Sequence, residues 1–279
     1  MRKGKKKDRA KKKHDTYPVE AKLVCDMLGG NTSPLISITF VGSPNLLTGS
    51  IHYPRSMGFM IERFDNGLRL VATCKHAVQF FWMPDYRNVI AFKNPKPTIL
   101  TCVGSPIEDP EAENDVAFFL VRDSSNAPTK PFSLHADNLN IVDGQILYNA
   151  QNRCEPLRGY YEVFVASQSI HNKKWIVFCK FSVKETHSVA LDDHERQNQL
   201  QQEGWIGHHL LQMVSRPGFS GSPIWDNQLR LYGMDIRGST PQDSFYAERG
   251  DVAVCLPTNV LYMARQRIEA TLQQRLSKA

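Results

Sequence analysis

The amino-acid sequence predicts an all-β protein of two six-stranded antiparallel β-barrels followed by a C-terminal α-helix. From Ser33 onward, short apolar runs rich in β-branched and aromatic residues alternate with Gly, Pro, Asn and Asp, a texture typical of barrels and sandwiches. A polar stretch with two prolines divides these runs into two groups, and a segment with helical periodicity follows the last run. With 279 residues, 41% of them hydrophobic, the chain can fill one large core or two smaller ones.

Residues 33–125 form the predicted N-terminal barrel. Its strands are expected at residues 35–42, 57–64, 68–74, 89–93, 98–104 and 116–121. The turn Asp65-Asn66-Gly67 lies between the second and third runs and is typical of an antiparallel hairpin.

Residues 126–142 are the predicted linker, because they are polar, contain Pro128 and Pro131 and lack periodicity. The second barrel is predicted within residues 143–279. Its strands are expected at residues 145–148, 160–166, 175–183, 210–214, 229–236 and 252–256, with a polar insertion at residues 191–204. Apolar residues recur at helical spacing after Thr258, which predicts one amphipathic helix over residues 258–277.

Residues 1–32 are a predicted tail and lead-in, and their charge is concentrated at the start. Residues 1–13 hold nine Lys or Arg and one Asp, a charge of +8, so the other residues carry about −2 of the total +6. Such a segment is expected to be disordered. It is either a solvated tail or a contact for an acidic partner, a nucleic acid or a targeting receptor.

The chain shows neither a long apolar run nor a secretory signal, so we expect no membrane association. Its six cysteines follow no CxxC or other metal-binding spacing. Several lie in apolar runs, which favours reduced, buried thiols in a reducing compartment, although their even number leaves disulfides open. We therefore expect a cytoplasmic protein, with a nuclear location open if the source is eukaryotic.

A candidate catalytic turn lies at residues 218–223, with the sequence GFSGSP. A serine hydroxyl becomes a nucleophile when a turn exposes it, a base takes its proton and backbone N–H groups receive the oxyanion. The glycines beside Ser220 suit the first and third requirements. His76, at the end of an apolar run, is the candidate base, and Asp115, just before another run, is the candidate group that orients it.

These segments, VATCKHAV, NDVAFFLV and PGFSGSPIW, resemble the three signatures of the chymotrypsin-like serine peptidases, in that family's order of His, Asp and Ser. YGMDIRGS and VAVCLPTNVL are similar to the strands that close the family's second barrel, so the resemblance spans about Leu35 to Ile268. It implies that Ser220 is the nucleophile, His76 the general base and Asp115 its orienting partner. The N–H groups of Gly218 and Ser220 would form the oxyanion hole.

The resemblance also implies a substrate-binding surface. Ile236, Arg237 and Gly238 match the edge strand that pairs with the substrate backbone. Val214 matches the base of the first specificity pocket, and Ser215 follows it. An uncharged base would favour a small or apolar side chain before the cleaved bond, unless the neighbouring Asp235 alters that preference.

The sequence departs from the family's best-known members at several positions. Phe219 stands where they have an aspartate that binds the N-terminus freed by zymogen cleavage, so activation by that route is not expected. The usual alanine pair before the histidine is Cys74-Lys75, and the cysteine after it is Ala77. Ser222 replaces the second glycine after the nucleophile. These features resemble relaxed-motif, non-secreted branches of the family.

The sequence therefore predicts a serine endopeptidase that acts on protein or peptide substrates through an acyl-enzyme, without a metal or another cofactor. The alternative is a catalytically silent barrel that serves as a binding or scaffold module, with nucleic acid bound through residues 1–13. A metal site of Cys74, His76, His208 and His209 is disfavoured, because Cys74 and His76 would point to opposite faces of an extended strand. The sequence leaves the oligomeric state open.

Overall fold

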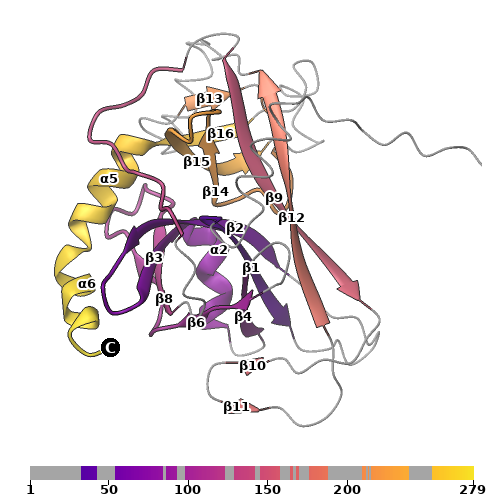
Figure 1. The fold of residues 1–279 in the computed structure, drawn as a ribbon, viewed down its shortest axis with the longest axis vertical. Helices are drawn as coiled ribbons and strands as arrows, with labels where there is room; N and C mark the ends of the chain where they lie inside the picture. The colour runs from indigo at the N-terminus through magenta and orange to yellow at the C-terminus, as the bar shows by residue number, and fades with distance from the viewer. Residues whose placement is uncertain are drawn as a thin grey trace, which may run out of the picture.

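The computed structural model describes residues 33–42, 54–83, 86–92, 98–122, 129–141, 145–157, 164–165, 168–169, 176–187, 209–211, 213, 215–238 and 253–279. The predictions made for residues 1–32, for the insertion at 191–204, and for Val214 and His208 lie outside these ranges. The described part of the chain is mostly β, with helices at its C-terminal end (Figure 1).

The first sheet is antiparallel and curled (Figure 1). Its strand order is β5-β4-β1-β2-β3-β8-β6, and β7 also pairs with β8. The strands are β1 (Leu35–Gly42), β2 (Arg55–Arg63), β3 (Leu68–Thr73), β4 (Tyr86–Phe92), β5 (Thr98–Ile99), β6 (Thr101–Cys102), β7 (Ile107–Glu108) and β8 (Ala117–Arg122). Between β3 and β4 lie the short helix α2 (Lys75–Val78) and the 3₁₀ turn η1 (Gln79–Trp82).

The second sheet has the order β12-β9-β14-β15-β16-β13 and is also antiparallel. Its strands are β9 (Ile146–Leu157), β12 (Ile176–His187), β13 (His209–Leu211), β14 (Ser222–Trp225), β15 (Leu231–Gly238) and β16 (Ala253–Pro257). The short strands β10 (Phe164–Val165) and β11 (Gln168–Ser169) form a separate pair. The predicted linker has neither helix nor strand over its described residues 129–141.

The prediction of an all-β protein with antiparallel sheets and a helical end is confirmed at this level. The prediction of six strands in each half is wrong for the first sheet, which has eight, because the run at 98–104 is divided into β5 and β6 and because β7 adds a short pairing with β8. In the described residues, the pairings of both sheets form open paths, so two closed barrels are not shown.

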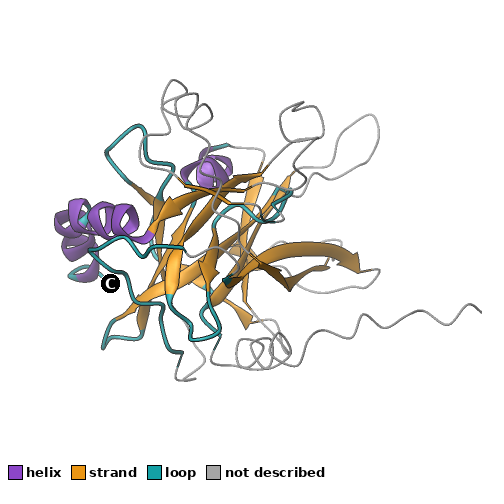
Figure 2. Cartoon of the chain, turned by 90° about the horizontal axis from the view of Figure 1, so that it is seen from above, coloured by secondary structure: helices purple, strands orange, loops and turns teal. Residues whose placement is uncertain are grey.

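The C-terminal segment forms two helices where one was predicted. α5 (Thr258–Arg267) and α6 (Glu269–Leu276) meet at Ile268, whose φ and ψ are −87° and 0°. Leu261, Ile268 and Leu272 are buried against the sheets, and Figure 2 shows these helices at one side of the strands. None of the helices in the described part of the chain combines the length and the apolar composition needed to cross a membrane.

A shared apolar core joins the two sheets. One cluster contains Phe59 and Phe118 from the first sheet together with Tyr148 and Trp225 from the second. Phe132 of the linker lies between them, with its ring 5.8 Å from that of Phe59 and 5.9 Å from that of Trp225. The space between the sheets is therefore a packed interior. This packing holds the two sheets in one relative position, and with them the residues of any site that both sheets contribute to.

Candidate active site

Residues 216–221 form a tight turn that precedes β14, and we call it the serine turn. Gly218 and Gly221 have φ angles of +97° and +82°, a left-handed conformation that glycine adopts readily. A Cβ atom at Gly221 would lie 2.0 Å from the carbonyl oxygen of Met57. Only glycine therefore fits here, and the neighbouring Ser220 is half-buried and lines a cavity.

Backbone hydrogen bonds hold the serine turn against both sheets. The N–H of Met57 in β2 donates to the Ser220 carbonyl over 2.7 Å. From the second sheet, the N–H of Asn152 donates to the Gly218 carbonyl over 2.8 Å. The N–H of Gly221 in turn donates to the Asp235 carbonyl over 2.7 Å. The position of Ser220 thus depends on both sheets being in place.

His76 and Asp115 are joined by two hydrogen bonds. The backbone N–H of His76 donates to Asp115 Oδ1 over 2.8 Å, and His76 Nδ1 lies 2.5 Å from Asp115 Oδ2. Because a carboxylate accepts, Nδ1 carries the hydrogen, which leaves Nε2 as the basic nitrogen. The His76 side chain is 45% exposed and that of Asp115 is 12% exposed, so the imidazole can meet a substrate while its partner stays covered.

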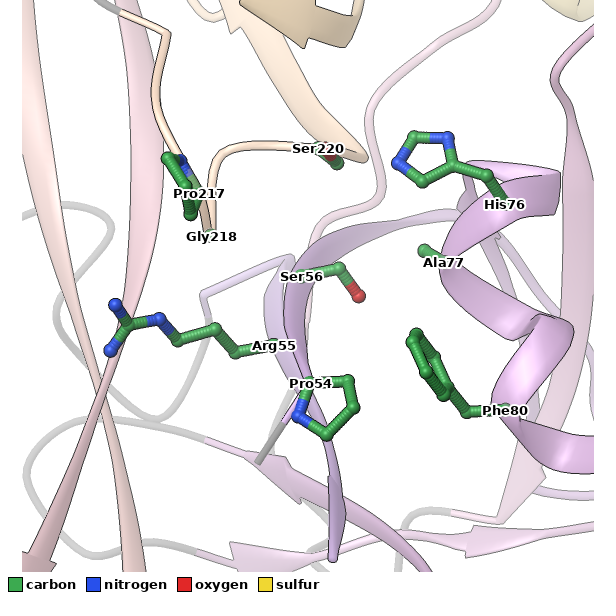
Figure 3. Close-up of a pocket in the computed structure, with 9 residues that line it drawn as sticks. All are labelled: Pro54, Arg55, Ser56, His76, Ala77, Phe80, Pro217, Gly218 and Ser220. Atoms are coloured by element: carbon green, nitrogen blue, oxygen red, sulfur yellow. The ribbon is translucent and has the colours of Figure 1, made fainter. Parts of the chain in front are cut away.

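Ser220 and His76 line the same cavity, whose volume is about 460 Å³. The imidazole ring is turned toward Ser220, with Nε2 on the near side (Figure 3). No described residue makes a hydrogen bond to the Ser220 hydroxyl in this structure. Catalytic hydrogen bonds are often long before substrate binds. The missing hydrogen bond therefore does not argue against proton transfer from Ser220 to His76.

The backbone amides of the serine turn suit an oxyanion. The N–H groups of Gly218 and Ser220 have no acceptor among the described residues, whereas the N–H of the intervening Phe219 donates to the Arg216 carbonyl over 3.0 Å. The amide of Ser220 itself and that of Gly218 are thus without an acceptor among the described residues and can bind a ligand oxygen. Phe219 itself is 1% exposed.

The predicted substrate-binding residues lie close together but outside this cavity. Ser215 and Ile236 are buried, Arg237 is exposed and Gly238 is half-buried. A Cβ atom at Gly238 would lie 2.1 Å from the carbonyl oxygen of Ser215, so these two segments are in direct contact. The described residues therefore show no open specificity pocket at this place, and Val214 lies outside them.

Asp235 is a fully buried carboxyl group directly behind the serine turn. Ser215 Oγ donates to its Oδ1 over 2.8 Å, and Asn149 Nδ2 donates to its Oδ2 over 3.3 Å. Burial raises the pKa of Asp235 to about 7, although these two hydrogen bonds and the charge of His76 act in the opposite direction. The sequence drew attention to Asp235 only as a neighbour of the substrate edge, because burial is not visible in a sequence.

The structure corrects the predicted geometry at Cys74 and His76. The chain turns into α2 at Lys75 instead of continuing as a strand, so the two side chains do not face opposite ways. The ligand atoms of Cys74, His76 and Asp115 all lie within 4.8 Å of one another, so these three form a group, found within the described residues, that could hold a metal ion. Burial, with the charges of Asp115 and Asp235, raises the pKa of the Cys74 thiol well above its usual value, which disfavours the thiolate that a metal needs.

Of the cysteines whose side chains are described, Cys74, Cys102 and Cys255 are free. Asn152 is a buried residue of β9 that the sequence did not single out. Its side-chain amide donates to Ile38 O, Thr39 Oγ1 and Ser56 O over 2.9, 3.0 and 3.0 Å. It lies beyond the predicted strand at 145–148, so no pattern in the sequence indicates this role.

Comparison of the chain with the sequence profiles of known families gives no match. Comparison with curated protein sequences gives no match either. The fold is similar to a solved structure titled "HtrA-type protease AlgWS227A with tripeptide", with 13% sequence identity and a TM-score of 0.47. The similarity covers 85% of this chain and 60% of the other, so this chain spans about 60% of that protein's length. A likeness of this size carries no information on activity.

Proposed function

We propose that this protein is a serine endopeptidase that cleaves peptide bonds through a covalent acyl-enzyme. The observation that carries the proposal is the pair of hydrogen bonds between His76 and Asp115, with His76 facing Ser220 across one cavity (Figure 3). The order of the three motifs along the chain, and their resemblance to the chymotrypsin-like signatures, support it independently. The same resemblance supports a two-barrel, chymotrypsin-like architecture.

The reaction would begin when Nε2 of His76 takes the proton of Ser220 and the serine oxygen attacks the substrate carbonyl. Asp115 would fix the tautomer and stabilise the imidazolium that forms. The N–H groups of Gly218 and Ser220 would receive the oxyanion, where loss of a single donor typically costs on the order of 3 kcal/mol of transition-state stabilisation. His76 would then protonate the leaving amine, and water would release the acyl group.

The site would form without cleavage of a zymogen. Phe219 is apolar and buried, so it cannot form an ion pair with a new N-terminus. The backbone bonds from Met57, Asn152 and to Asp235 already hold the serine turn. Control of the activity would therefore come from another source than N-terminal processing.

Labelling with a fluorophosphonate tests the proposal directly, since this probe reacts with an activated serine. Wild-type protein near pH 8 under reducing conditions should be labelled. Ser220→Ala and His76→Ala should lose both labelling and peptide cleavage while remaining folded. Ser56→Ala removes another serine of the same cavity and should keep the label, which identifies the reacting residue. An unlabelled wild type would contradict the proposal.

A second candidate is a catalytically silent barrel that binds partners. Two observations favour it: the Ser220 hydroxyl makes no hydrogen bond to a described residue, and Gly238 packs directly on Ser215. Its nucleic-acid version depends on residues 1–13, which lie outside the described part of the chain. Deletion of these residues should eliminate a salt-sensitive affinity for nucleic acid if the tail is its source.

A further inference from the structure

The cavity beside Ser220 and His76 is walled by the first sheet, its helical segment and the serine turn, not by β15. Besides these two residues, its walls include Arg55 at the start of β2 and Phe80 in η1. None of Ser215, Ile236, Arg237 and Gly238 lines it. The cavity is therefore separate from the surface that the sequence assigns to the acyl half of a substrate.

The position of His76 indicates which half of a substrate this cavity would hold. In the proposed reaction, His76 protonates the nitrogen of the leaving group, so the residue that carries this nitrogen must lie beside the imidazole. Ala77 and Phe80 follow His76 on the same segment and line the cavity with it. In Figure 3, the Phe80 ring lies below Ala77 and opposite Pro54, which makes this wall apolar.

Arg55 forms the other wall and supplies a positive charge. It is exposed, and no described residue makes an ion pair or hydrogen bond with its guanidinium group. Its stem packs against the serine turn, since a Cβ atom at Gly218 would lie 3.6 Å from Arg55 Cγ. Figure 3 shows the side chain extending away from Phe80, on the side where Pro217 and Gly218 lie.

Side chains of an extended peptide point alternately to opposite sides. A peptide whose first leaving-group residue faces Phe80 would therefore direct the next side chain toward Arg55. We infer that this cavity binds the two residues after the cleaved bond, and that Arg55 selects an acidic side chain at the second of them while Phe80 and Ala77 favour an apolar side chain at the first. This inference rests on the proposed peptidase function.

Cleavage of a proteome-derived peptide library, read by mass spectrometry, tests the inference without a known substrate. Asp and Glu should be enriched, and Lys and Arg depleted, at the second position after each cut. One cleaved sequence is then made as matched peptides that differ only by Glu, Gln or Lys at that position. Wild type should have a kcat/KM for the Glu peptide about threefold to tenfold above that for the Lys peptide, a gap that narrows in high salt.

Arg55→Glu should reverse the preference between the two peptides, and Arg55→Ala should abolish it. Arg63→Glu is the matched control, because Arg63 is an exposed arginine at the opposite end of the same strand, and it should keep the wild-type preference. The ratio of kcat/KM values is insensitive to a general loss of active protein, and fluorophosphonate labelling verifies that Ser220 of each variant still reacts.

Two failures are distinguishable. A labelled, active wild type with equal kcat/KM for the Glu and Lys peptides, or a preference that survives in Arg55→Glu, would overturn this inference and leave the peptidase proposal intact. A wild type that the probe does not label would overturn both.

Discussion

Gly221 and Gly67 both have a left-handed backbone, with φ angles of +82° and +84°, but their surroundings differ. A Cβ atom at Gly221 would collide with Met57 O and Thr73 Oγ1, whereas one at Gly67 would meet nothing within 4 Å. A side chain at Gly67 would meet only backbone strain, whereas one at Gly221 would meet both backbone strain and a steric clash. The two positions show that the glycine after Ser220 is required by the packing of the serine turn, beyond its φ angle.

Gly67→Ala should lower the free energy of unfolding by about 1–2 kcal/mol, the strain of a left-handed alanine. Gly221→Ala should lower it by at least about 3 kcal/mol, because Met57 and the serine turn must also move apart. Urea unfolding of the two variants measures the difference. Gly221→Ala should also lose fluorophosphonate labelling. Equal losses of unfolding free energy in the two variants would show that the serine turn can adjust to a methyl group.

The buried Asp235 predicts an unusual dependence of stability on pH. Its pKa rises from about 4 in the unfolded chain to about 7 in the folded protein, so the folded state binds the proton more tightly. Its contribution to stability is full below about pH 4 and declines as the pH rises through 7. Between about pH 5 and 8, the loss corresponds to about 2–3 kcal/mol.

Asp235→Asn removes this titration while keeping an oxygen that can accept from Ser215. The Tm of the variant should therefore fall less than the Tm of wild type between about pH 5 and 8, because the other titrating groups are common to both proteins. Calorimetry at several pH values gives the comparison. If both proteins lose Tm in parallel, Asp235 is not the group that titrates.

At the level of secondary-structure elements, helix α5 is held to the first sheet by a two-pronged ion pair. Arg267 Nε and Nη2 donate to Asp109 Oδ1 and Oδ2 over 2.8 and 2.6 Å, and the Asp109 side chain has no exposed surface. Burial alone would raise the pKa of Asp109, but the bonds from Arg267, Asn114 and the Glu111 amide lower it below its usual value. Asp109 therefore stays ionised and depends on Arg267.

Arg267→Ala should cost about 2–3 kcal/mol of stability, since it leaves a buried carboxylate without its cation. Asp109→Asn in the same chain should recover part of that loss, because the uncharged amide no longer needs the arginine. A double-mutant cycle by urea unfolding gives the coupling. Losses that simply add would show that the two side chains do not interact in solution.

Many of the strands can be predicted from the sequence, because runs rich in β-branched residues and bounded by turn residues are typical of strands. The break at Ile268 was not readable, because the apolar residues from Val260 to Leu276 keep a helical period across it. Helix α2 was missed for a related reason. It is four residues long, and Cys74 makes no capping hydrogen bond, so the run into His76 looked like a continuing strand.

Across the whole molecule, Asn152 links the two sheets. Its side-chain amide donates hydrogen bonds to three oxygens of the first sheet, and its backbone N–H donates to the Gly218 carbonyl. The partners of its side chain are 96 to 114 residues away in sequence, so no local sequence pattern can reveal them. The motifs around His76, Asp115 and Ser220 were easier to find, because each carries its own local signature beside an apolar run.

Asn152→Asp keeps the shape but replaces the donor by a carboxylate that faces three oxygens. It should lower the free energy of unfolding by about 3–5 kcal/mol. The control is Asn66→Asp in the exposed turn after β2, where the side-chain oxygen only accepts from Leu68 N, so stability should change by less than about 0.5 kcal/mol. Urea unfolding followed by fluorescence and circular dichroism measures both. A stable Asn152→Asp protein would contradict the linking role.

The attachment of the serine turn to both sheets has a consequence for biosynthesis. Met57 leaves the ribosome long before Asn152 and Asp235, yet all three must be in place before Ser220 is held in position. A growing chain would thus carry His76 and Asp115 without a formed nucleophile until β15 has been synthesised. The proposed peptidase would be inert toward its own nascent chain and its neighbours until then, with no inhibitory segment required.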